Sequence, residues 1–263
     1  MKVLFISSGN IHQINPIIKN QGESLKRAGI DLEFFTIRGK GLFGYLKNVL
    51  PLRRKIIIGN YDLVHAHYSL SAITASLTLK RPLVVSLMGS DVYASGAILR
   101  LIRLLSKRWW NANIVKSQEM KEKLRLPGAL VIPNGVNTDL FKPMMKTEAL
   151  AKLEWEHDKK HILFPANKER EVKNFGLAEK SVKMLDDPDV HIHSLENVPN
   201  CRMPLYYNAA DVVLMTSHWE GSPNAIKEAM ACNAPIVATD VGDIKSNLEG
   251  VDNCHVTDAD PVP

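Results

Sequence analysis

Cysteine and long hydrophobic runs are both scarce in this sequence. The three cysteines, Cys201, Cys232 and Cys254, are widely spaced and form no CxxC pair, so neither a disulfide framework nor a zinc site is indicated. No stretch approaches the roughly 20 apolar residues that a membrane span requires. The opening MKVLFISSGN has an apolar run of only four residues, which is too short for the core of a signal peptide. We therefore expect a cytoplasmic protein.

The length of the chain exceeds that of a usual single domain. A chain of 263 residues is longer than the ~100 to 150 residues of a typical single core, so we expect two domains joined by a linker. Apolar residues make up 45% of the chain and charged residues 23%. This is the balance of an ordinary globular protein, and it leaves little room for long disordered segments.

The charge is distributed unevenly between the two halves. Residues 1–140 contain 20 Lys or Arg against 8 Asp or Glu, and residues 141–263 contain 13 against 20, which gives net charges of +12 and −7. A basic half suits a phosphorylated acceptor or an anionic membrane surface. The alternative is that Lys and Arg only solvate helix surfaces. Nucleic acid is not expected as a partner.

Short β-branched runs alternate along the whole chain with segments long enough for crossover helices. This alternation predicts parallel, doubly wound sheets. The pattern pauses at IPNGVNTDLFKP and then restarts. We therefore predict two Rossmann-like α/β domains, residues 1–135 and 146–263, joined by a hinge at 136–145, with substrate in the cleft between them at the carboxyl ends of the strands. The predicted strands are 3–7, 32–37, 62–67, 83–87, 113–115, 129–132, 161–165, 190–195, 211–216, 235–239 and 254–256.

The segment SHWEGSPNAIKEAMACNAPIVATDVG, residues 217–242, follows a predicted strand and contains a helix with recognisable ends. Ser222 is expected to be the N-cap, with Pro223 in the first turn. Asn233, followed by Pro235, is expected to end the helix.

The first turn of this helix predicts an anion site. The amides of Asn224 and Ala225 have no partner within the helix and lie at the positive end of its dipole, where a pyrophosphate can bind. Glu220 precedes the helix and Glu228 lies about five residues into it, on the order of 8 Å away along the axis. Each carboxylate can accept two hydrogen bonds from vicinal hydroxyls. The alternative is an acidic pair that caps and solvates a surface helix.

The block YYNAADVVLMTSHWEGSPNAIKEAMACNAPIVATDVGDI, with E-x7-E in EGSPNAIKE, resembles the donor site of the family 4 retaining glycosyltransferases. IPNGVNTDLFKP resembles the interdomain signature of the same family. The resemblance spans nearly the whole chain and implies the GT-B fold. It also implies transfer of a sugar from a UDP- or GDP-linked donor, without a metal or cofactor, to a glycan, a lipid-linked or a small-molecule acceptor. Glu228 would bind the ribose hydroxyls and Glu220 the hydroxyls of the donor sugar.

The same resemblance implies a basic pair for the diphosphate. The region LFPANKEREVKNF follows the first strand of the second half. Lys173 matches the family lysine, while Lys168 stands where the family has Arg, and Arg170 lies close by. Lys is a weaker bidentate clamp than Arg, but it still neutralises phosphate. A solvated charge run is the alternative for this region.

In DLVHAHYS, His65 and His67 share one face of a strand near its carboxyl end. Such a pair could ligate a metal, yet no third ligand is evident, so we expect no metal site. His67 is a candidate for the acceptor side of the catalytic site, and for His65 a buried structural imidazole is the alternative.

The loop SLMGSDVY resembles the family loop in which a His precedes a Gly and an acidic residue follows. Met88 stands where that His is common. Gly89, Ser90 and Asp91 are candidate cleft residues, and Asp91 is the candidate for the catalytic site.

The first strand–helix loop, SSGNIHQINP at residues 7–16, lacks GxGxxG, which argues against a dinucleotide dehydrogenase. Gly9 would allow the backbone to approach a phosphate closely, and a plain tight turn is the alternative.

The stretch AILRLIRLLSKRWW, residues 97–110, carries an apolar helical stripe with basic residues alongside. It could rest on an anionic membrane. The alternative is a core-facing crossover helix with a basic outer face. The stripe comprises Ile98, Leu101, Ile102, Leu105 and Trp109.

Two other functions remain open. A sugar-nucleotide epimerase shares the two-sheet fold and would consume a nucleotide sugar without an acceptor. A noncatalytic nucleotide-sugar-binding subunit is suggested by Met88 and by the end of the sequence at DADPVP, because in the family further helices follow the last strand and cross back. We therefore expect these crossing helices to be absent.

Overall fold

The computed structural model describes residues 1–9, 14–39, 41–80, 82–93 and 95–259. The chain divides into two compact units, Met1–Asn134 and Gly135–Pro263. Part of the predicted loop at 7–16 and the last four residues lie outside the described range. Within that range, no helix is long and apolar enough to cross a membrane.

The first unit is built on a six-stranded parallel sheet with the order β2-β1-β3-β4-β5-β6. The middle of the first strand, VLFIS, is buried, because a parallel sheet is covered on both faces and its strands need apolar side chains on both. Phe5 pairs with Phe34 on one side and with His65 on the other. The strands are β1 Lys2–Ser8, β2 Asp31–Ile37, β3 Leu63–His67, β4 Leu83–Ser86, β5 Ala112–Val115 and β6 Leu130–Val131.

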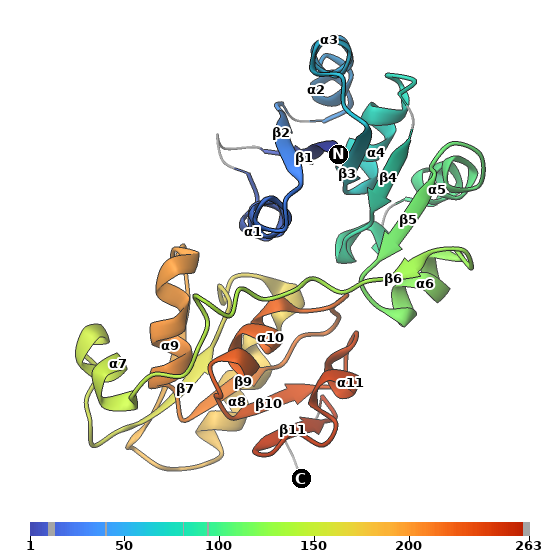
Figure 1. Ribbon diagram of the computed structural model, residues 1–263. Helices are drawn as coiled ribbons and strands as arrows, with labels where there is room; N and C mark the ends of the chain where they lie inside the picture. Colours follow the sequence, from blue (N-terminus) through green and yellow to red (C-terminus); the bar gives the residue numbers. More distant parts are fainter. Residues whose placement is uncertain (10–13, 40, 81, 94, 260–263) are drawn as a thin grey trace. The chain divides into compact units, whose positions relative to one another are not determined.

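Helices connect these strands and cover the sheet (Figure 1). The first helix begins after Asn15, whose side chain accepts a hydrogen bond from the Ile17 amide at 2.9 Å, and Pro16 fits its first turn. The helices of this unit are α1 Pro16–Arg27, α2 Gly41–Leu46, α3 Val49–Gly59, α4 Ser69–Ser76, η1 Gly89–Tyr93, α5 Gly96–Arg108 and α6 Gln118–Leu124.

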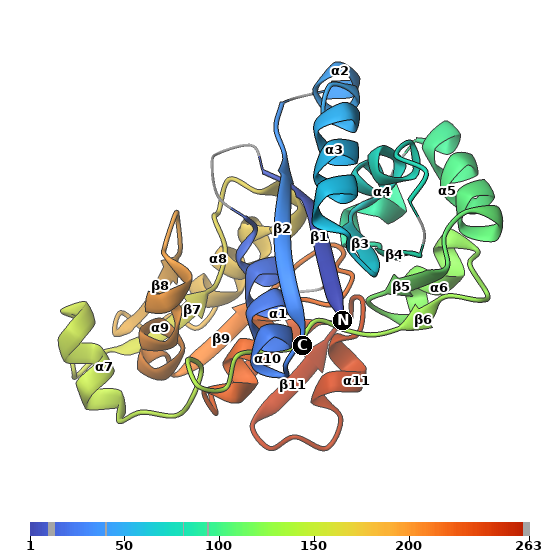
Figure 2. The ribbon, with the colours of Figure 1, turned by 45° about the horizontal axis from the view of Figure 1, so that its top comes forward.

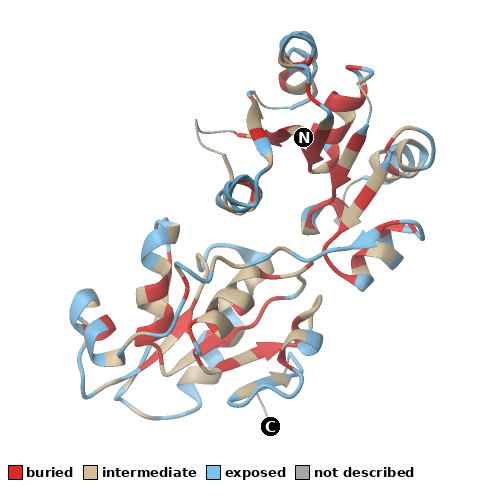
Figure 3. Cartoon of the chain, viewed as in Figure 1, coloured by how far each residue is buried: buried red, intermediate tan, exposed pale blue. Residues whose placement is uncertain are grey.

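The second unit has a five-stranded parallel sheet with the order β11-β10-β9-β7-β8. In Figure 3 the cartoon is coloured as buried along much of both sheets. Its strands are β7 Lys160–Phe164, β8 Val190–Ser194, β9 Val212–Met215, β10 Ile236–Thr239 and β11 Cys254–Thr257. Its helices are α7 Lys146–Leu153, η2 Glu171–Lys173, α8 Phe175–Lys183, η3 Asn200–Arg202, α9 Met203–Ala209, α10 Asn224–Ala231 and α11 Ile244–Leu248.

The segment predicted as a hinge, residues 136–145, packs onto the second unit. Phe141 is 1% exposed and belongs to the core of that unit, where its ring lies 6.1 Å from the ring of Tyr207. Asn208 accepts a hydrogen bond from the Met144 amide at 2.8 Å. This segment is therefore anchored to the second unit by side-chain packing.

Every predicted strand is present, within one or two residues at each end, so the prediction of two parallel Rossmann-like sheets is confirmed. The apolar stripe of α5 faces the core of the first unit: Ile102 is fully buried, and Ile98, Leu105 and Trp109 pack against the same core. The structure therefore agrees with the second interpretation of this segment, a crossover helix whose apolar stripe faces the core.

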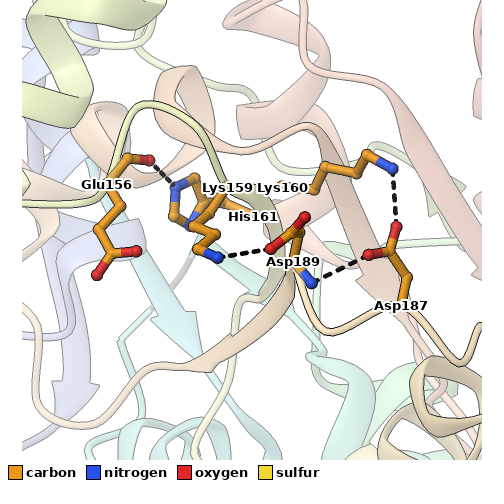
Figure 4. A network of polar contacts seen from close by, with 6 residues as sticks. All are labelled: Glu156, Lys159, Lys160, His161, Asp187 and Asp189. Carbon is orange, nitrogen blue, oxygen red and sulfur yellow. Dashed lines mark hydrogen bonds and ion pairs between the residues drawn. The ribbon is translucent and has the colours of Figure 1, made fainter.

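A polar network lies at the amino-terminal ends of β7 and β8 (Figure 4). Lys159 pairs with Asp189 at 2.5 Å, and Lys160 pairs with Asp187 at 2.9 Å. Exposed pairs of this kind contribute little individually. Ligands of such folds bind at the carboxyl ends of the strands. The network lies at the opposite edge of the sheet, so its role is structural.

Candidate functional site

Each sheet has one point at which the strand order reverses, and ligands of doubly wound folds bind beyond the carboxyl ends of the strands there. In the second unit, β7 lies between β8 and β9, so the reversal falls between β7 and β9. In the first unit, β1 lies between β2 and β3, so it falls between β1 and β3. These two points locate the candidate site residues.

At the reversal in the second unit, Lys173 follows β7 and Glu220 follows β9, and the two side chains form an ion pair. The side chains are only 14% and 13% exposed. Ser217 donates a second hydrogen bond, at 2.8 Å, to the same Oε1 of Glu220. Both contacts use Oε1, so together they hold the Glu220 carboxylate in one orientation.

The loops that carry this pair are tied together through the backbone. The Thr216 hydroxyl donates to the carbonyl of Asn174 at 2.8 Å, and the His218 amide donates to the carbonyl of Val172 at 2.9 Å. The Thr239 hydroxyl at the end of β10 donates to the carbonyl of Ser217 at 2.8 Å. Loops from three adjacent strands therefore hold one fixed geometry.

Gly242 supports the same loop from the β10 side. Its φ is +66°, and a Cβ at this position would lie 2.9 Å from the carbonyl oxygen of Glu220 and 2.8 Å from that of Gly221. Only glycine accepts both the left-handed backbone and this close approach. The β10–α11 turn is therefore packed directly against the backbone of the Glu220 loop.

We expect Gly242→Ala to lower the free energy of unfolding by about 2 to 4 kcal/mol, because it adds the displacement of a packed loop to the left-handed backbone penalty. Gly250→Ala is the matched control, since Gly250 has a φ of +72° but no atom within 4 Å of its Cβ position. It should cost only about 1 kcal/mol. Urea unfolding measures both, and equal losses would show that the Glu220 loop does not press on Gly242.

Helix α10 begins at Asn224, one residue later than the sequence suggests, and Ser222 does not cap it. The N-cap is Pro223, and it makes no side-chain capping bond. The Ser222 hydroxyl instead donates to Asp243 at 2.6 Å and accepts from Lys227, whose ammonium lies 3.9 Å from Asp243. The N-cap prediction for Ser222 is therefore wrong: a buried carboxylate from the β10–α11 turn takes the hydroxyl that would have capped the helix.

Lys227 and Asp243 are buried partners, with side chains 13% and 11% exposed. Burial lowers the pKa of Lys227, and the Asp243 carboxylate opposes that shift. Together with the Ser222 hydroxyl, this pair forms a network of charge-assisted hydrogen bonds beside the first turn of α10.

The carboxyl end of α10 confirms the predicted stop. Asn233 adopts a φ of +58°, its amide donates to Met230 at 2.9 Å, and the Ala234 amide donates to Ala229 at 3.0 Å. This is the Schellman arrangement, with Asn in the left-handed position.

Glu228 lies on α10 and is half-buried. The hydroxyl of Tyr207 in α9 donates to its Oε2 at 3.0 Å. Burial raises the pKa of Glu228, while the hydrogen bonds from Tyr207 and Asn200 lower it. Burial likewise raises the pKa of Tyr207 well above its usual value, so this phenol stays a hydrogen-bond donor. Tyr207 therefore holds the Glu228 carboxylate in one orientation.

The other two basic candidates lie on the surface of the β7–α8 loop. Lys168 and Arg170 are exposed, and Arg170 precedes η2, where its carbonyl accepts from the Lys173 amide at 2.8 Å. They are near Lys173 in sequence, but neither shares its ion pair with Glu220.

In the first unit, His65 and His67 lie on one face of β3, as predicted, with ring centroids 4.4 Å apart. His65 contacts the Ser86 hydroxyl at 2.8 Å, and His67 contacts Gln21 at 3.2 Å. Burial lowers the pKa of His67 to about 3, and the positive charge of Lys116 adds to this effect. Both rings are therefore neutral near pH 7.

The backbone at the end of β3 is strained. Tyr68 has a φ of +70°, although it carries a bulky side chain, and its amide donates to the Ser86 carbonyl at 3.0 Å. Such strain gathers at functional sites and persists only where surrounding contacts hold it. The position is the reversal point of the first sheet.

Asp91 is 4% exposed and accepts backbone hydrogen bonds from Ser69 at 3.0 Å and from Met88 at 2.6 Å. Burial raises its pKa, and these hydrogen bonds oppose the shift. Asp91 therefore joins the start of α4 to the loop after β4.

Gly9 is buried at the end of β1, and its amide donates to the carbonyl of Ile37 at 3.1 Å.

Four residues of these sites were not expected from the sequence: Tyr207, Lys227, Asp243 and Lys116. Lys227 and Asp243 are 16 residues apart and belong to different elements, so no local pattern links them. Lys116 did carry a signal in the sequence, because it directly follows a predicted strand, and the structure shows that it is only 4% exposed there. In the described part of the chain, no group of three or more His, Cys, Asp or Glu is placed to hold a metal ion.

Comparison with known proteins assigns both halves of the chain. Residues 20–140 match the family described as Glycosyltransferase Family 4, and residues 154–262 match the family described as Glycosyl transferases group 1. The chain belongs to the family 4 glycosyltransferases. The resemblance seen in its motifs is confirmed, and its two sheets are those of the GT-B fold.

The related proteins are longer than this glycosyltransferase chain. TuaC of Bacillus subtilis, a glycosyltransferase assigned to teichuronic acid biosynthesis, is 29% identical over 217 residues, which cover 70% of this chain and 54% of TuaC. The D-inositol 3-phosphate glycosyltransferase of Xylanimonas cellulosilytica is 26% identical, over 78% of this chain and 62% of that protein. The chain thus spans 54% to 63% of the length of the curated relatives.

Solved structures show the same fold at low identity. Sucrose-phosphate synthase from Thermosynechococcus elongatus has a TM-score of 0.81 at 18% identity, covering 99% of this chain and 86% of that one. HepE of Anabaena, in complex with UDP, has a TM-score of 0.72 at 20% identity, covering 98% and 86%.

Proposed function

We propose that this protein transfers a sugar from a nucleoside diphosphate donor to an acceptor hydroxyl, with retention at the anomeric carbon. The observation that carries the proposal is the buried Lys173–Glu220 ion pair at the strand-order reversal of the second unit. It puts a cation for a diphosphate, from the β7–α8 loop, next to a carboxylate for sugar hydroxyls, from the loop that leads into α10.

The diphosphate is the leaving group, and its negative charge grows as the bond to the sugar breaks. Lys173 and the first-turn amides of α10, those of Asn224 and Ala225 after Pro223, are proposed to stabilise that charge. Ser222 is proposed to act through Asp243 and Lys227, which fix the start of the helix. Lys168 and Arg170 are exposed nearby and are proposed as outer phosphate contacts.

Glu228 is proposed to accept hydrogen bonds from the ribose hydroxyls, and Glu220 from the hydroxyls of the donor sugar. The Tyr207 bond to Oε2 orients the Glu228 carboxylate, and carboxylate oxygens can each accept more than one hydrogen bond, so a ligand hydroxyl can be accepted as well. A vicinal pair of hydroxyls is the ligand that suits such an oriented carboxylate best.

The reaction is proposed to need neither a metal nor a cofactor, with UDP- or GDP-linked sugar as the substrate. The acceptor oxygen would bond to the anomeric carbon on the face from which the diphosphate departs, and the hydroxyl proton would pass to the departing phosphate oxygen. The HepE complex with UDP and the UDP-glucose complex of the same protein support a uridine donor.

The first unit is proposed to serve the acceptor. Asp91 holds two backbone amides and His67 is 1% exposed, so both are proposed to position the ends of β3 and β4. Gly9 is proposed to let the backbone approach the substrate. TuaC and the inositol phosphate enzymes support a glycan or a phosphorylated polyol acceptor, and thus a role in polysaccharide or glycoconjugate synthesis.

Turnover of a nucleotide sugar tests the proposal. UDP-glucose and GDP-mannose are incubated with the protein, with and without a set of glycan and lipid-linked acceptors, and free nucleoside diphosphate and product anomers are measured. Acceptor-dependent release with a retained anomer supports the proposal. Consumption without acceptor would indicate the epimerase alternative, and binding without turnover would indicate a noncatalytic subunit.

A further inference from the structure

Two adjacent helices of the first unit expose an unusual number of large apolar side chains. Phe43 and Leu46 of α2 are 85% and 43% exposed, and Leu50, Ile57 and Ile58 of α3 are 69%, 69% and 85% exposed. Figures 1 and 2 show the two helices next to each other, with α2 beyond one end of α3. Scattered exposed apolar residues are ordinary, but a contiguous group marks an interaction surface.

The inner face of α3 packs against the core of the first unit. Leu52 is fully buried and Ile56 is 5% exposed, and both belong to the core of the first unit. These residues are four apart, so they form one stripe. The outer apolar residues therefore lie on the rest of the helix surface and are not needed for the fold.

The charged residues within the segment that carries these side chains are all positive. No acidic residue occurs between Glu33 and Asp62, while the same stretch holds six Lys or Arg. Lys55 is held by Glu33 at 2.6 Å, but Lys47, Arg53 and Arg54 are exposed. Apolar and basic side chains thus alternate on one outward face, which we call the α2–α3 face: Phe43, Leu46, Lys47, Leu50, Arg53, Arg54, Ile57 and Ile58.

We propose that the α2–α3 face docks the protein onto an anionic lipid bilayer. Apolar side chains would enter the acyl boundary, and the basic ones would meet the phosphates of anionic lipids. A second copy of the chain fits less well, because a symmetric dimer through this face would bury the basic residues of both copies in one interface without an acidic partner from the face itself. The inference does not depend on glycosyl transfer.

The location differs from the helix that the sequence pattern suggested. On α5, Ile98, Ile102, Leu105 and Trp109 pack into or against the core, and the large apolar side chains left exposed are Leu101 and Leu104, at 37% and 47%. The α2–α3 face is thus the stronger docking surface of the first unit, and α5 supplies an internal control.

Vesicle flotation with the full chain tests the proposal. The wild type should bind vesicles of phosphatidylglycerol and phosphatidylcholine at least tenfold more tightly than pure phosphatidylcholine, and 0.5 M salt should weaken this binding. The double variant Ile57→Ser with Ile58→Ser should lose at least tenfold in vesicle affinity. Arg53→Gln with Arg54→Gln should lose about 25-fold in affinity for the anionic vesicles, at about fivefold per charge.

Two matched variants control for general effects. Met184→Ser with Leu185→Ser removes side chains that are 51% and 56% exposed on the second unit. Arg100→Gln with Lys107→Gln removes two exposed charges from α5. Each should change vesicle affinity by less than about threefold. An unchanged thermal midpoint checks that all variants fold.

Three results would overturn the proposal. The first is equal binding of the wild type to neutral and anionic vesicles. The second is a loss in the α5 variant as large as in the α2–α3 variants. The third is a dimer of the wild type that Ile57→Ser with Ile58→Ser dissociates without changing vesicle binding, since the face would then be a contact between copies.

Discussion

Glu220→Gln is expected to lower kcat by about 100-fold or more, with a much smaller change in the donor KM. The substitution keeps the shape of the side chain and removes its charge. It weakens the contact to the donor sugar at the reacting centre, where positioning has its largest effect on rate. It also leaves the ammonium of Lys173, 14% exposed, without its carboxylate partner. Steady-state kinetics with varied donor sugar nucleotide measures both constants.

Glu169→Gln is the matched control for this variant. Glu169 is an exposed carboxylate in the β7–α8 loop, near Lys173 in sequence but outside the ion pair. Its kinetics should stay within about twofold of the wild type, because exposed charges of this kind contribute little. If Glu220→Gln kept its kcat, Glu220 would not act on the reacting sugar.

Glu228→Ala is expected to raise the donor KM by roughly 10- to 150-fold with little change in kcat. The ribose contact is proposed to be present in the ground state and the transition state alike, so its loss weakens binding uniformly. A hydrogen bond to a charged group is worth about 1.5 to 3 kcal/mol. Tyr207→Phe should give a smaller rise in KM, because it removes only the bond that orients Glu228.

Glu249→Ala, an exposed carboxylate after α11, serves as the control for this second variant and should leave KM unchanged. Reversed roles would appear as a kcat loss in Glu228→Ala with kcat intact in Glu220→Gln. If neither variant changed turnover or nucleotide affinity, EGSPNAIKE would not be the donor site.

The fold could be predicted from the sequence because each strand is marked by the residue types within its own short segment. The runs VLFIS and LEFFTI are rich in β-branched or aromatic residues and are bounded by polar ones, and both lie within strands; HILFP forms a strand up to Phe164. Buried parallel strands need apolar side chains on both faces, so a short continuous run suffices to mark them. The strand that was shortest in the structure, Leu130–Val131, is also the most exposed one.

The contacts of the site were less predictable, because they join distant segments. Ser222 has the residue type of an N-cap, but Asp243 from another turn captures its hydroxyl. The tertiary partner overrides the local preference. The partnership of Lys173 with Glu220 spans 47 residues, and nothing in either local segment specifies it.

The positions of His67 and Asp91 follow the same rule. Periodicity correctly placed His67 on one face with His65, yet it gave no measure of burial, and the ring is 1% exposed. Asp91 is occupied by the amides of Ser69 and Met88, and the Ser69 contact comes from 22 residues away.

Thermal unfolding in the presence of nucleotides tests the central claim, a diphosphate site formed by Lys173 and the first turn of α10. At a concentration of 100 times Kd, a ligand that binds only the native state adds about 2.7 kcal/mol. For a chain of this size we expect UDP or GDP to raise the midpoint by about 5 to 10 °C. NAD should leave it unchanged, because the first loop lacks the dinucleotide glycine pattern. A rise with NAD alone, or no rise with either nucleoside diphosphate, would contradict the account.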